Sequence, residues 1–153
     1  PRTRYLAAQS ALVLAEGLYH RFGEVQLRQP FERSLKEKQQ RMNSALEAFG
    51  ALVDYEVGEV TAAATFYMAE LYGDFSRALV GSERPSDLAA GEMQEYEAAL
   101  EENAFPFEEK AIAVHQKNLE LLLFNKFQNQ FVRRSLRFEA FLDVVQEILG
   151  AFS

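Results

Sequence analysis

The chain has 153 residues, the length of one ordinary domain, and is long enough to bury a hydrophobic core without metals or disulfides. Hydrophobic residues make up 48% and charged residues 25%, as in soluble globular proteins, and the absence of cysteine excludes disulfides and thiol chemistry. A net charge of −7 argues against nucleic-acid binding, because phosphates need a basic surface, and no apolar run approaches the roughly 20 residues of a membrane span.

Apolar residues recur at intervals of three and four almost throughout, which is the periodicity of helices. The first predicted helix covers about residues 3–22 and ends before Gly23, a helix-stop signal. Its apolar residues near one face are Leu6, Leu14, Leu18 and Phe22. The second predicted helix begins at Pro30, has Glu32 in its first turn and runs to about residue 56. Its apolar side is marked by Phe31, Leu35, Met42, Leu46, Phe49 and Val53.

Gly58 is the expected break before a third helix over roughly residues 59–80. Several alanines on this helix would let another helix approach closely, and its bulk comes from Phe66, Tyr67, Leu71 and Phe75. We expect the third helix to be the most buried, with Phe66, Leu71 and Phe75 in the core.

A linker over residues 81–87 leads to a fourth predicted helix, for which Ser86 is a good N-cap and which ends at about residue 103. Pro106 is expected to start a fifth helix, because the first helical position does not need an N–H. The residue before a proline avoids the α region, so the chain should bend between Asn103 and Phe107. A sixth helix is indicated by Phe138, Phe141, Leu142, Val145, Ile148, Leu149 and Phe152.

Long helices joined by short connectors favour antiparallel neighbours, and no strand pattern stands out. The sequence therefore predicts an all-α single domain over residues 1–153. We expect antiparallel helical hairpins that form an array or a bundle of about five to six helices, with residues 1–121 as the array and residues 122–153 as an amphipathic C-terminal tail.

The block over residues 55–79, followed by residues 82–88 and 102–112, resembles the C-terminal region of large bacterial tetratricopeptide-repeat proteins of the proteobacterial cell envelope. The most specific part is Ala104-Phe-Pro-Phe-Glu-Glu-Lys-Ala111, followed by His115 and Asn118. The resemblance covers roughly residues 22–121. That family continues with a tryptophan-containing block, and this chain has no tryptophan.

The resemblance implies a tetratricopeptide-like, non-enzymatic scaffold for protein–protein contacts in the bacterial periplasm or cell envelope. It implies a protein partner and no catalytic residues, metal or cofactor. Because the chain starts at Pro1 rather than at a methionine, we expect it to be part of a longer protein. A homo-oligomer is a further possible assembly.

The residues themselves give little indication of a metal site or a catalytic site. A di-iron bundle needs Glu-x-x-His pairs, but Gly17 and Ile112 stand three residues before the only histidines, His20 and His115. The nine acidic residues between Glu83 and Glu109 are better explained as a solvated face than as catalytic carboxylates, which need burial. No phosphate-binding loop or Ser-His-Asp set is present.

Two further patterns leave alternatives open. The basic start of the second helix could complement the acidic helix of the same chain or an acidic patch on a partner, or its charges could be solvated; intramolecular or solvated use is the commoner case. It comprises Arg28, Arg33, Lys36, Lys38 and Arg41. Aromatic residues on the third helix could line a peptide groove, although such residues are more often core, and they are Phe66, Tyr67, Tyr72 and Phe75.

The tail is the sharpest candidate for an interaction surface, because basic residues alternate there with aromatic ones. Such a helix could dock its apolar stripe on protein, which is the commoner use, or lie on a membrane surface. The second possibility is the main alternative function: a lipid-binding helical domain that makes peripheral membrane contact. The candidate residues are Phe127, Phe131, Arg133, Arg134 and Arg137.

Overall fold

The computed structural model describes residues 1–131, 143 and 145–150, with side chains up to residue 123 in the first of these ranges. The helices are α1 (Arg2–Glu24), α2 (Phe31–Ala51), the short 3-10 helix η1 (Leu52–Tyr55), α3 (Gly58–Val80) and α4 (Ala90–Phe131). No strand occurs among the described residues. The all-α prediction is confirmed.

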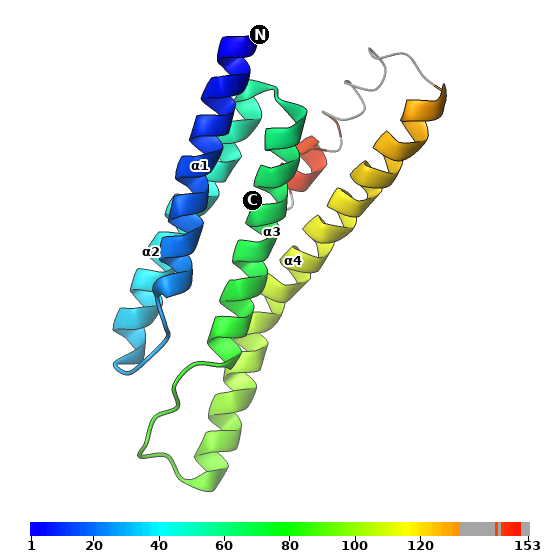
Figure 1. Cartoon of the computed structure of the whole chain (residues 1–153). Helices are drawn as coiled ribbons and strands as arrows, with labels where there is room; N and C mark the ends of the chain where they lie inside the picture. The colour runs from blue at the N-terminus through cyan, green and yellow to red at the C-terminus, as the bar shows by residue number, and fades with distance from the viewer. Residues whose placement is uncertain (132–142, 144, 151–153) are drawn as a thin grey trace.

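Successive long helices run antiparallel, as the short connectors predicted (Figure 1). The helices α1 and α2 form a pair, and both contact α3, whose other side carries α4 in the most extensive interface between described helices. The helix α3 therefore lies at the centre, between the α1–α2 pair and α4.

Glycine and proline mark the element ends close to where the sequence predicted them. Pro30, in an extended conformation, precedes the first residue of α2, and α3 begins at Gly58. Between them, Glu56 adopts a left-handed conformation with φ 56° and ends η1. This conformation turns the chain from η1 towards the start of α3.

The core is richest on α3, where twelve residues are buried, among them Leu71 and Phe75. Phe22 of α1 and Phe49 of α2 are also fully buried and belong to the same hydrophobic cluster. The expectation that α3 is the most buried helix is confirmed for the described side chains.

Phe66 corrects that expectation in one respect, because 48% of its surface is exposed. Residues on a helix are rotated by about 100° from one to the next, so Phe66 and Phe75 point in opposite directions. They cannot face the same core, and the prediction for Phe66 is wrong.

The predicted apolar face of the first helix is also partly wrong. Leu6 and Leu14 are exposed, whereas Ala8, Ala15 and Phe22 are buried at intervals of seven residues. The small alanine side chains let the backbone of α1 approach its neighbours closely, and the larger leucines lie outside that contact.

The largest correction concerns Pro106, which lies inside the continuous helix α4 rather than at the start of a new helix. Ala104 on one side of the proline and Ala111 and Val114 on the other are buried, so both halves of α4 pack on protein. This packing outweighs the lost backbone hydrogen bond, and Figure 1 shows α4 changing direction along its length, as prolines cause.

Ser86 does not cap this helix. It lies in a turn before α4, and the helix begins at Ala90. The backbone N–H of Ala89 donates instead to the carboxylate of Glu92 at 3.1 Å, so an acidic side chain of the first turn reaches back to the end of the helix.

The described C-terminal residues pack against protein, as expected for the apolar tail. Val145 and Ile148 are fully buried, and Ile148 forms a small cluster with Ala69 of α3 and Val114 of α4. The Nζ of Lys117 lies 3.0 Å from the Glu147 carboxylate. The other predicted contact residues of the tail lie outside the described residues: Phe138, Phe141, Leu142 and Phe152.

Candidate interaction surface

The tail surface that the sequence singled out lies beyond the last described side chain of α4. Phe127 and Phe131 belong to the last turns of α4, where the side chains lie outside the described part of the chain. Arg133, Arg134 and Arg137 also lie outside the described residues. This surface stays a prediction.

The two histidines have structural neighbours. Nε2 of His115 lies 3.0 Å from the Glu70 carboxylate, and its ring contacts the edge of Phe66 with the centroids 5.6 Å apart. The ring of His20 contacts Tyr19 in the same manner. Among the described residues, no group of three or more His, Asp or Glu side chains is placed to hold a metal ion.

The basic residues at the start of α2 do not pair with the acidic helix α4. Arg41 pairs with Glu37 at 3.5 Å, Arg28 bonds to the side chain of Gln26, and buried Lys38 donates to the backbone oxygen of Phe22 at 2.8 Å. This carbonyl also accepts from the backbone N–H of Val25 at 3.3 Å, so Lys38 adds a second donor at the end of α1. Within the described part of the chain, the intramolecular alternative with α4 is wrong.

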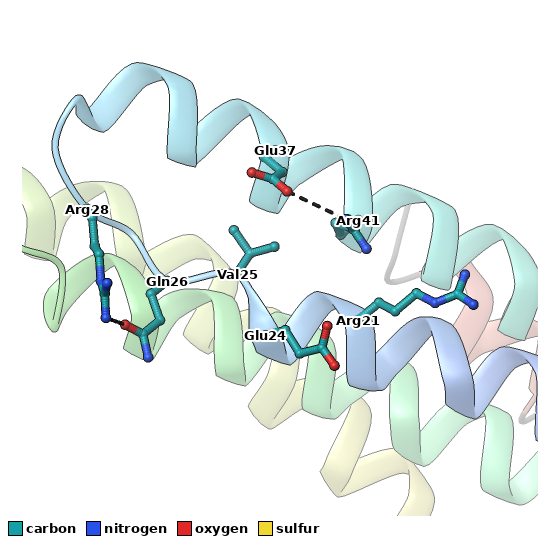
Figure 2. Close-up of a pocket in the computed structure, with 7 residues that line it drawn as sticks. All are labelled: Arg21, Glu24, Val25, Gln26, Arg28, Glu37 and Arg41. Atoms are coloured by element: carbon teal, nitrogen blue, oxygen red, sulfur yellow. Dashed lines mark hydrogen bonds and ion pairs between the residues drawn. The ribbon is translucent and has the colours of Figure 1, made fainter.

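A charged pocket of about 460 Å³ lies between the end of α1, the following connector and α2 (Figure 2). Figure 2 shows the Glu37–Arg41 ion pair on one wall and the Arg28–Gln26 bond on the other. Five of its seven lining residues are charged, and they comprise Arg21, Glu24, Val25, Gln26, Arg28, Glu37 and Arg41. The mixed charges offset each other, so the pocket selects no ligand charge strongly.

Next to this pocket, a polar network joins α1 to α3. The hydroxyl of Tyr19 donates to the Asp74 carboxylate at 2.5 Å, and Arg77 pairs with the same carboxylate. Burial raises the pKa of Tyr19 well above its usual value of 10.0, and the bond to Asp74 raises this pKa further. Burial lowers the pKa of Lys38, against a smaller opposing effect of Asp74.

The predicted aromatic groove on α3 does not form. Phe75 and Tyr72 are buried, and Tyr67 stacks on Phe49 with ring centroids 5.0 Å apart. Only Phe66 is exposed. These aromatics therefore face several directions and serve mainly as core.

A groove of about 500 Å³ lies instead between α3 and α4. We call it the α3–α4 groove. Val80, Ala111 and Ile112 are its apolar lining, and two glycines also line it. Its lining comprises Glu70, Gly73, Ser76, Arg77, Val80, Gly81, Glu108, Ala111, Ile112 and His115.

An exposed apolar line runs along α4 beside this groove. Phe105, Ile112 and Leu119 are 56%, 50% and 57% exposed, and Leu123 is 47% exposed. The first three are seven residues apart and Leu123 follows Leu119 by four, so all four lie on one side of the helix. We call these four residues the α4 stripe, and Ile112 belongs to both the stripe and the groove.

Sequence reasoning missed the α4 stripe because it placed a helix boundary at Pro106. Once a boundary is assumed there, Phe105 and Ile112 belong to different helices and their seven-residue spacing has no meaning. The seven-residue spacing of these apolar residues is present in the sequence, but it indicates a shared face only once α4 is known to be one continuous helix.

No protein family, curated protein or solved structure matches the chain. None of the described helices is long and apolar enough to cross a membrane.

Proposed function

We propose that this protein is a non-enzymatic helical scaffold that binds another protein through α4. The observation that carries this proposal is the α4 stripe, a row of four large apolar side chains that are each about half exposed. Exposed apolar patches of this kind commonly mark interaction sites. The seven-residue spacing also favours a helical partner, because helices meet along such rows.

The tetratricopeptide-like resemblance supports the same proposal and adds a location in the bacterial periplasm or cell envelope. Antiparallel hairpins around α3 give α4 a rigid support, which a binding surface needs if its side chains are to be held in place. Fractionation of cells that make the full-length protein tests the location.

Site-specific photo-crosslinking tests the scaffold function. A photoreactive phenylalanine analogue replaces Phe105 or Ile112 in the full-length protein in its own cells, and the matched control carries the analogue at exposed Gln40 of α2. We expect discrete protein adducts from the two α4 positions and none from Gln40. The absence of protein adducts from both α4 positions would overturn the proposal.

The alternative function, a membrane-surface domain, rests on the tail residues that lie outside the described part of the chain. Co-sedimentation with anionic and with zwitterionic vesicles separates the two functions. Tight binding to anionic vesicles that disappears when Arg133, Arg134 and Arg137 are replaced by glutamine would favour the membrane function over the scaffold.

A further inference from the structure

We infer that the α4 stripe and the adjoining α3–α4 groove together receive a basic amphipathic helix of another protein. This inference rests on the proposed function and names the partner's chemistry. It follows from three features of one surface: a line of apolar side chains, a recess beside that line and exposed carboxylates around it that pair with no other described residue.

The apolar line fixes the geometry of the partner. Phe105, Ile112 and Leu119 repeat every seven residues over two heptads, and a second helix that lies alongside can match such a row with its own heptad-spaced side chains. An extended peptide would place alternate side chains on this surface and would not follow the seven-residue row.

The recess supplies an anchor site. Ile112 stands between the α4 stripe and the α3–α4 groove, so a helix seated on the stripe has the groove at its side. Val80 and Ala111 offer apolar contact to a large side chain of the partner, and Glu108 places a carboxylate at the same site. The other charged lining residues already have partners, because Glu70 lies against His115 and Arg77 pairs with Asp74. A long basic side chain, with an apolar stem and a charged head, fits that combination.

The carboxylates beside the α4 stripe determine which net charge the partner helix should carry. Glu101, Glu102, Glu108 and Glu109 are exposed beside the stripe, and none of them forms an ion pair with another described residue. Four exposed carboxylates close together repel acidic partners and anionic membranes and attract lysine and arginine. The partner is therefore basic.

A designed peptide tests this inference directly. It is a helical peptide of about 21 residues with leucine at the a and d heptad positions and lysine at e and g, and the control peptide has glutamate in place of every lysine. Fluorescence anisotropy with the full chain should give a Kd at least about tenfold lower for the lysine peptide. Equal Kd values, or no binding of the lysine peptide, would overturn the inference.

Matched variants locate the binding surface. Ile112→Asp should raise the Kd about tenfold, while Leu14→Asp, at an exposed leucine of α1, should leave it unchanged. The double variant Glu108→Lys/Glu109→Lys should raise the Kd at low salt and have a smaller effect at 0.5 M salt, and Glu47→Lys on α2 is its control. Equal effects of a variant and its control would contradict the assignment.

The experiment also separates this inference from the scaffold function. Protein adducts at Phe105 together with no preference for the lysine peptide would leave the scaffold function standing and overturn the basic-helix partner. Concentration-dependent dimerisation in analytical ultracentrifugation that Ile112→Asp abolishes would identify a second copy of this chain as the occupant and would likewise overturn it.

Discussion

Phe66 and Phe75 are the same residue type on one helix, yet one is half exposed and the other is 1% exposed. Their separation of nine residues explains this contrast, since it turns the helix by about half a rotation. The sequence contains enough information to predict that only one of them is core. It does not say which one, because that depends on where the neighbouring helices lie.

Alanine replacement at both positions checks this contrast. We expect Phe75→Ala to lower the free energy of unfolding by about 3–5 kcal/mol, because it leaves a cavity in the core. Phe66→Ala should lower it by less than about 1 kcal/mol, because the side chain is half solvated. Urea unfolding followed by circular dichroism measures both values, and equal losses would contradict the structure.

The Tyr19–Asp74 bond was beyond prediction, because its partners are 55 residues apart and on different helices. We expect Tyr19→Phe to lower the free energy of unfolding by about 1–2 kcal/mol at pH 8. The raised pKa of Tyr19 makes this difference depend on pH. The contribution of Tyr19 to the free energy of unfolding is fully present below about pH 10, the approximate pKa of tyrosine in the unfolded chain. It declines as the pH rises above that value, because tyrosine in the unfolded chain loses its proton before Tyr19 in the folded chain does.

Urea unfolding of both proteins at pH 8 and pH 11 checks this expectation. The difference in stability between wild type and Tyr19→Phe should shrink at the higher pH. The pKa values of Tyr67 and Tyr72 are also raised, but these residues are present in both proteins and cancel in the comparison. A difference that stays constant between the two pH values would show that Tyr19 is not held in its neutral form.

At the scale of elements, the helix boundaries near Pro30 and Gly58 were predictable because local signals and tertiary packing agree there. The helix boundary predicted at Pro106 was wrong because the local signals and the tertiary packing disagree there. Local propensity opposes a helix at this position, and the packing of Ala104, Ala111 and Val114 favours one. Local propensity can be read from the sequence, whereas tertiary packing cannot.

Replacing Pro106 tests this balance. Pro106→Ala adds an N–H that can donate to the carbonyl of Glu102, so we expect the free energy of unfolding to rise by about 1–3 kcal/mol. Thermal melts by circular dichroism measure the change. The matched variant Ala113→Pro, at an exposed position of the same helix, should destabilise by about 3 kcal/mol. A loss of stability in Pro106→Ala would show instead that the bend is needed to keep α4 on α3.

At the scale of the whole molecule, helical periodicity predicted the fold class, and the short connectors predicted the antiparallel order of the helices. The composition of α3 predicted that it would be the most buried helix, but which of its faces meets α4 and which meets α1 and α2 depends on tertiary packing. The position of Ile148 between α3 and α4 is a further example, since only the folded chain brings it to Ala69 and Val114.

Ile148 shows how much the C-terminal residues contribute to the fold. We expect Ile148→Ala to lower the free energy of unfolding by about 2–5 kcal/mol, because the side chain is fully buried. Glu147→Ala, which removes the exposed ion pair with Lys117, should produce no measurable change. Chemical denaturation distinguishes the two variants, and a harmless Ile148→Ala would place the C-terminal residues away from the core.

Because the contact between α3 and α4 is broad, we expect it to hold the molecule together even when the connector over residues 81–89 is cut. A protease cut in this connector would leave two pieces, one with α1 to α3 and the other with α4 and the C-terminal residues, each presenting the apolar face that the other covers. Two such pieces produced separately should find each other and reassemble. The protein is therefore suited to use as a split pair, in which reunion of the halves reports that two attached molecules have met.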